Sequence, residues 1–200
     1  MEELILIAPQ NVPLVAAKRS GNRARALFEP LLAHQQILRQ IIDAQLGEWI
    51  GVKLLDLRNP DAARERAFLR RKQLPERATL HAWDDELCRA LDGKADEKTL
   101  SVLLTTMLDG FPRGMVPNIR TFVEGALIVI DHHALAPEIL AAAIVRIWRK
   151  NKFPPTISEL LDECNRARQG ATNARRVVAK MIALLDNAEE ILGATGEIRQ

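Results

Sequence analysis

The chain has 200 residues, of which 48% are hydrophobic and 27% are charged, and its formal net charge is +2. This mixture is typical of one folded globular domain and argues against a largely disordered chain. Because the net charge is small, any nucleic-acid surface must come from local clustering of basic residues. Cys88 and Cys164 are far apart and lack partners at metal-ligand spacing, so we expect no zinc site or disulfide and infer a reduced, cytoplasmic chain.

The N-terminal region has no recognisable targeting signal. Its apolar run, Leu4 to Ile7, follows two glutamates instead of basic residues, and no stretch reaches about 18 apolar residues. We therefore expect neither secretion nor a membrane span. Residues 1–24 are predicted to form an N-terminal arm and a basic connector.

Residues 25–95 are predicted to form a long amphipathic helix followed by short helices. Apolar residues recur at helical spacing from about Arg25 to Leu57. The Arg-rich stretch 61–72 predicts a solvent-facing helix that Pro75 ends, and residues 79–93 predict a further short helix. His81 lies near two aspartates, but we interpret this group as ordinary exposed polar residues and not as a catalytic pair.

Residues 96–169 carry clear start and stop signals for successive helices. Asp96 is predicted to begin the first of them, either Pro117 or Asn118 the second, and Pro137 falls in the first turn of a third. His132 and His133 lie in the connector between the last two helices. Adjacent histidines point in different directions and lack a third ligand nearby, so we expect no metal site.

The next stretch, residues 149–161, holds the strongest local signals and is called the corner segment below. Pro154 and Pro155 stop the preceding helix and favour an extended conformation at Phe153. The sequence from Thr156 to Glu159 then matches a capping box, which begins a new helix. The corner segment therefore predicts two helices joined by a rigid corner, with Phe153 free to act as an anchor.

After the corner, a short helix is expected to fade at Gln169–Gly170, and residues 170–200 are expected to form a C-terminal helix and tail. That second helix has a heptad-like apolar stripe, formed by Ala174, Val177, Met181, Leu184, Ala188 and Ile191. The stripe suits either an antiparallel hairpin with the long first helix or a homodimer seam. The whole pattern predicts an all-α bundle of about seven helices.

Motifs typical of enzymes are missing from the sequence. It contains no phosphate-binding loop, no Gly-rich dinucleotide loop and no signature of a zinc protease or a serine hydrolase. It also contains no tyrosine, which removes one type of nucleophile and base-stacking side chain. We therefore expect a binding protein with no catalytic residues, no cofactor and no metal.

The segment from about Leu100 to Arg168 resembles the ATPase-free replicative-helicase loader and inhibitor proteins of phages and related mobile elements. The resemblance rests on the order of the helices, on the aromatic-Pro corner Phe111–Pro112 and on the string Phe153-Pro154-Pro155-Thr156-Ile157. It implies a role in phage or plasmid DNA replication and contact with a replicative helicase.

The predicted function is thus a non-enzymatic replication accessory protein that binds a replicative helicase and has DNA nearby. We place partner binding on Trp148, Phe153, Pro154, Pro155, Thr156 and Glu159. Binding of nucleic-acid phosphates is placed on the basic residues around the corner segment, which are Arg146, Arg149, Lys150, Lys152, Arg166, Arg168, Arg175, Arg176 and Lys180. The alternative is a helical structural or regulatory protein that dimerises through its C-terminal helix and binds no nucleic acid.

Overall fold

The computed structural model describes residues 24–43, 60–94, 96–112 and 118–194, and every regular element within these ranges is a helix. The all-α prediction is therefore confirmed. Residues 24–31 are helical, and the remaining helices are α2 (Ala33–Asp43), α4 (Pro60–Gln73), α5 (Arg77–Asp92), α6 (Glu97–Asp109), α7 (Ile119–His132), α8 (Pro137–Lys150) and α9 (Ile157–Ala194).

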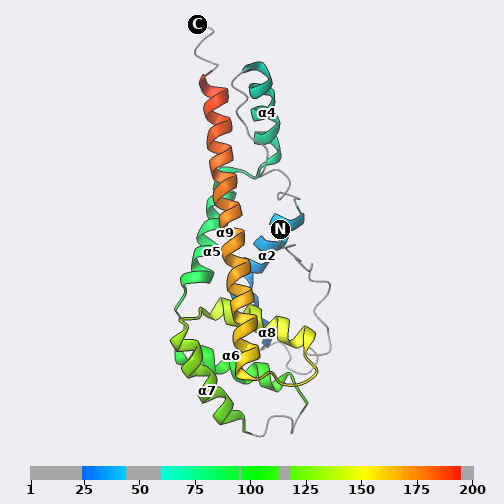
Figure 1. The fold of residues 1–200 in the computed structure, drawn as a ribbon, viewed down its shortest axis with the longest axis vertical. Coiled ribbons are helices and arrows are strands. Elements are labelled where there is room, and N and C mark those ends of the chain that lie inside the picture. Colours follow the sequence, from blue (N-terminus) through cyan, green and yellow to red (C-terminus); the bar gives the residue numbers. More distant parts are fainter. Residues whose placement is uncertain (1–23, 44–59, 95, 113–117, 195–200) are drawn as a thin grey trace.

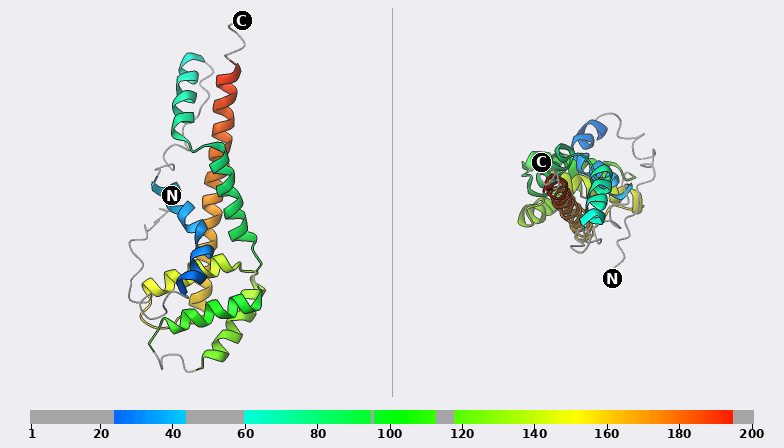
Figure 2. Two further views of the ribbon diagram at one scale, coloured as in Figure 1. Left: turned by 180° about the vertical axis from the view of Figure 1, so that it is seen from behind. Right: turned by 90° about the horizontal axis from the view of Figure 1, so that it is seen from above.

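The longest helix, α9, runs along the length of the molecule (Figure 1). Its 38 residues correspond to a length of about 57 Å. α5 lies antiparallel to it, as shown by ion pairs from Arg77 to Asp186 and from Arg175 to Asp84. α4 packs near its C-terminal end, whereas α6, α7 and α8 gather around its N-terminal end. α2 lies against both α5 and α9, which is clearest from behind (Figure 2).

The prediction that a short helix ends at Gln169–Gly170 is wrong, because α9 continues through Gly170 without a break. A single glycine inside a helix costs only about 1 kcal/mol relative to alanine. Burial of Ala167, Ala171 and Ala174 on the inner face offsets this cost. The predicted boundary between residues 169 and 170 therefore falls inside a helix.

Because α9 is continuous, the apolar spacing that starts at Leu160 sets which residues face inward further along. The buried stripe repeats at intervals of three and four residues and consists of Leu160, Cys164, Ala167, Ala171, Ala174, Val178, Met181, Leu185 and Ala188. The predicted stripe is correct at Ala174, Met181 and Ala188. It is wrong at Val177 and Leu184, which are only partly buried, since their neighbours Val178 and Leu185 take the inner positions.

The long first helix was predicted from Arg25 to about Leu57, and part of that range lies outside the described residues. Within them, the helix over residues 24–31 is followed by a turn at Leu32 and then by α2. Pro30 stands just before this turn, where its ring disfavours continued helical hydrogen bonding. The antiparallel partner of α9 is α5, and not the first helix as the predicted hairpin required.

Helix starts in the second half agree with the sequence. The side chain of Asp96 accepts a hydrogen bond from the Thr99 amide at 2.8 Å, and that of Asn118 accepts one from the Thr121 amide at 3.1 Å. Pro137 occupies the first turn of α8. These caps satisfy amides that have no partner inside their own helix, which is why they mark helix starts reliably.

One hydrophobic cluster links the described helices other than α4, extending from Phe28 and α2 through α5, α6, α7 and α8 to Leu185 on α9. Its members come from three of the four predicted segments, so residues 25–95, 96–169 and 170–200 share a core. None of the helices in the described ranges combines the length and the apolarity needed to cross a membrane.

Candidate functional site

The corner between α8 and α9 is held by its own local hydrogen bonds. The Glu159 amide donates to the Thr156 hydroxyl at 3.2 Å, and the Thr156 amide donates to the Glu159 carboxylate at 2.7 Å. This reciprocal pair confirms the predicted capping box. Pro155 is buried beside it, and the amide of Asn151 donates to the carbonyl of Ile147 at 2.8 Å where α8 ends. The backbone on both sides of Phe153 is therefore fixed.

Phe153 projects from this fixed corner with 63% of its surface exposed. Phe28 and Phe111 are buried in the core, so exposure is specific to this position and to Phe68 on α4. Transfer of a phenylalanine side chain from water to an apolar environment is worth about 1.5–3 kcal/mol. A partner with a complementary pocket would gain this free energy without having to order the backbone.

Trp148 was predicted to bind a partner, but the structure shows its side chain partly buried against the hydrophobic core. Its ring lies 5.2 Å from the ring of Phe28, measured between centroids. Its indole nitrogen donates a hydrogen bond of 3.0 Å to the carbonyl of Met107. Trp148 therefore joins α8 to α6 and to the N-terminal helical segment, whereas Phe153, Thr156 and Glu159 of the predicted partner-binding set are exposed.

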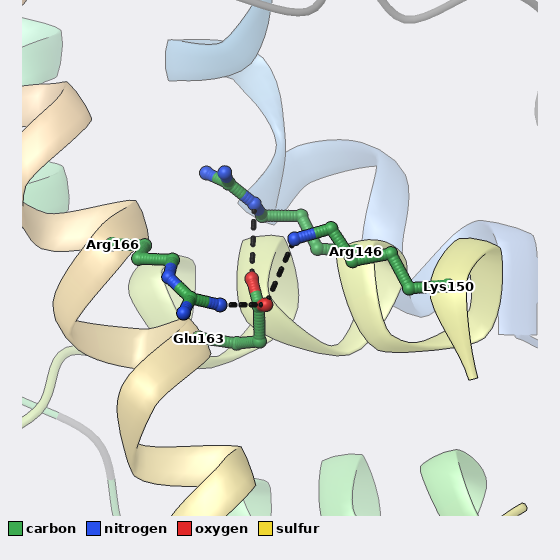
Figure 3. A network of polar contacts seen from close by, with 4 residues as sticks. All are labelled: Arg146, Lys150, Glu163 and Arg166. Atoms are coloured by element: carbon green, nitrogen blue, oxygen red, sulfur yellow. Dashed lines mark hydrogen bonds and ion pairs between the residues drawn. The ribbon is translucent and has the colours of Figure 1, made fainter. Parts of the chain in front are cut away.

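Three of the predicted basic residues meet at one carboxylate, that of Glu163 on α9 (Figure 3). Lys150 donates to it at 2.9 Å, and Arg166 donates to the same oxygen. Arg146 forms an ion pair with the other oxygen at 3.2 Å. Burial acts to raise the pKa of Glu163, but Lys150, Arg166 and Arg146 outweigh this effect and hold the pKa below its usual value.

Two further predicted phosphate contacts are engaged in the fold. Arg168 donates to the carbonyls of His133 and Ala134, both at 2.9 Å, where Ala134 has a positive φ of 45°. Arg175 bridges α9 to α5 through Asp84, with an N–O distance of 3.1 Å. These contacts reduce the capacity of both arginines to bind nucleic acid.

The remaining predicted basic residues do not form one compact surface. Lys152, Arg176 and Lys180 are exposed, and the ion pairs among the described residues do not include them. Arg176 and Lys180 lie on α9, about 15 Å and 21 Å along the helix from Arg166. Arg149 lies half-buried near the end of α8.

Glu163, the centre of this charged group, was not predicted from the sequence. Its spacing from Arg166 is an i,i+3 pair, which was visible in the sequence. Its contacts with Arg146 and Lys150 come from packing α8 on α9, for which no local signal exists.

The described residues offer no ligand set for a metal ion. No cluster of three or more histidine, cysteine, aspartate or glutamate side chains is arranged there to hold an ion. The rings of His132 and His133 meet edge to face with centroids 5.3 Å apart.

Comparison of the chain with protein-family models, with curated proteins and with solved structures gave no match.

Proposed function

We propose that this chain is a non-enzymatic helical accessory protein that binds a partner protein through the corner segment. The observation that supports this proposal most directly is the exposure of Phe153 on a backbone fixed by the Thr156–Glu159 capping box. A rigid aromatic side chain is a typical anchor of a protein interface, because little conformational entropy is lost when it enters a pocket.

The proposed partner is a replicative helicase, and the proposed setting is replication of phage or plasmid DNA. Support comes from the resemblance of residues 100–168 to helicase loader and inhibitor proteins, whose Phe-Pro-Pro-Thr string coincides with the corner segment. Lys152 stands beside Phe153 and is exposed, so it is placed to contact either an acidic rim on the helicase or DNA bound near it.

The alternative, dimerisation through the stripe between Val177 and Ile191, has less support. Met181 and Ala188 are fully buried within the single chain. A dimer through the same stripe would require these side chains to leave their present contacts. Substitution of Met181 by a charged residue would therefore disturb the core of the monomer, and it is a poor test of dimerisation.

The proposal is tested by binding of the full chain to the purified hexameric replicative helicase of the same organism. Phe153→Ala should weaken binding at least about tenfold, as expected for a central interface anchor. Phe68→Ala is the matched control, because Phe68 is 60% exposed but lies on α4, near the opposite end of α9. Circular dichroism should show that both variants keep their helical content.

Equal affinity of wild-type protein and the Phe153→Ala variant would overturn the role of the corner. Absence of helicase binding by the wild-type protein would overturn the choice of partner. Equal weakening by both substitutions would also count against the proposal, since it would indicate a nonspecific apolar contact.

A further inference from the structure

We propose that the chain binds a phosphate group between α2, α8 and α9, at a site formed by Arg39, Arg146, Arg149, Lys150 and Arg166. This group of five side chains is called the phosphate site below. The inference does not depend on partner binding through Phe153, because it rests on the charge and hydrogen bonding of other side chains.

Positive charge is in excess at the phosphate site. Arg146, Lys150 and Arg166 all contact the carboxylate of Glu163. Arg149 lies on the same side of α8, three residues after Arg146, and Arg39 acts on it electrostatically from α2. Among the described residues, Glu163 is the one carboxylate that forms ion pairs with members of this group, and one carboxylate cannot neutralise five cations. The group therefore keeps an excess of positive charge that favours a multivalent anion.

Arg149 has a donor that no acceptor in the described part of the chain satisfies. Its Nε atom is buried and makes no hydrogen bond to any described residue. A buried donor without an acceptor is unfavourable, and a bound oxygen atom would satisfy it. Arg146 uses its Nε atom toward Glu163, while its two terminal nitrogens point away from that carboxylate (Figure 3). Both guanidinium groups thus keep donors that an anion can use.

Arg149 also experiences electrostatic repulsion from neighbouring positive charges. Burial lowers the pKa of its guanidinium, and the positive charges of Arg39 and Arg146 act in the same direction. The charge of Arg149 is therefore disfavoured both by its loss of solvation and by the positive charges of its neighbours. An anion between the three arginines would reverse this effect, because each cation would then face an opposite charge.

The chemistry of the donors favours phosphate over a carboxylate. Guanidinium groups bind phosphate oxygens through two parallel hydrogen bonds, and a phosphate dianion offers enough oxygens for several arginines at once. The Glu163 carboxylate already lies within ion-pair distance of Arg146, Lys150 and Arg166. The group that fits the remaining donors has more charge and more oxygens than another carboxylate.

The test is isothermal titration calorimetry of the full chain with inorganic pyrophosphate, in phosphate-free buffer at constant ionic strength. We expect one site, and an affinity at least about tenfold weaker in Arg39→Gln and in Arg149→Gln. Arg39 is exposed on α2, so its substitution leaves the core intact even if Arg149→Gln disturbs folding. Arg176→Gln is the control, because it removes the same charge from an exposed position on α9.

No binding of pyrophosphate would overturn the proposal, as would equal weakening in the Arg176→Gln control. A second titration with a short single-stranded oligonucleotide identifies the source of the phosphate. If the oligonucleotide competes with pyrophosphate for the wild-type protein, and Arg149→Gln abolishes this competition, the result would support the site and assign it to a nucleic-acid backbone. Pyrophosphate binding that depends on Arg149, without competition from the oligonucleotide, would support it as a site for free phosphate compounds.

Discussion

The indole nitrogen of Trp148 donates a hydrogen bond of 3.0 Å to the carbonyl of Met107, and Gly110 lies directly beside it. A Cβ atom at Gly110 would stand 2.4 Å from that nitrogen. The backbone of Gly110 is in the ordinary right-handed helical region, with φ −69° and ψ −14°. Glycine is therefore required at this position for space, and not for conformational freedom.

Gly110→Ala should consequently destabilise the protein by about 1–3 kcal/mol, as is typical when atoms are forced into a packed site. The added methyl group must displace the indole and break its hydrogen bond to Met107. Urea unfolding would measure the loss, and near-ultraviolet circular dichroism should show a changed signal from tryptophan. A stability equal to that of the wild type would contradict the close contact between Gly110 and Trp148.

Gly170→Ala should have the opposite effect. Gly170 lies inside the continuous helix α9, and a Cβ atom there would meet nothing within 4 Å. Alanine should stabilise the helix by about 1 kcal/mol, because it restricts the unfolded chain without a steric penalty. Thermal and urea unfolding would detect the gain. A loss of stability would indicate that α9 bends or breaks at this residue.

Thr156→Ala should cost about 1 kcal/mol of stability, since the amide of Glu159 loses its acceptor at the start of α9. Glu159→Ala should cost a similar amount of stability. The double variant should lose less than the sum of the two single losses, because the residues form one reciprocal cap. Ser158→Ala is the control, since Ser158 is exposed in the same turn. Strictly additive losses in urea unfolding would argue against a coupled pair.

His34 should make the protein sensitive to mild acid. Burial lowers its pKa from 6.5 to about 4, while a backbone hydrogen bond with Leu31 acts weakly in the opposite direction. The unfolded chain thus binds the proton more readily, so stability is complete above about pH 6.5 and falls as the pH decreases toward 4. Between pH 7 and pH 5 the loss from this group should be about 2 kcal/mol.

The matched variant for this experiment is His34→Leu, which replaces the titrating imidazole by an apolar side chain of similar size. Urea unfolding between pH 5 and pH 7 should show a flatter pH dependence in the variant than in the wild type. An unchanged slope would show that other groups cause the acid sensitivity.

The two cysteines should differ in reactivity toward a thiol reagent. Cys164 is fully buried on the inner face of α9, and burial raises the pKa of its thiol to about 12. Cys88 is only partly buried on α5, although burial and Asp84 raise its pKa as well. We expect one slow-reacting thiol in the native protein and a second that appears only on unfolding. Cys88→Ser should abolish the native signal, and Cys164→Ser should leave it unchanged.

The sequence by itself determined the helices and most of their ends. Asp96, Asn118, Pro137 and the Thr156–Glu159 pair act within a single helical turn, so their effect does not depend on the rest of the fold. For the same reason the sequence predicted a fixed backbone around Phe153. The all-α class followed from the helical spacing of apolar residues along the chain.

The tertiary structure alone decided which of these residues face solvent and which meet. Val177 and Val178 are equally apolar, as are Leu184 and Leu185, and the inner member of each pair follows from the packing of the continuous helix α9 against α4 and α5. Packing likewise partly buried Trp148, left Phe153 exposed and brought Arg146 and Lys150 to Glu163. These outcomes depend on contacts between residues distant in the sequence, and local spacing carries no information about such contacts.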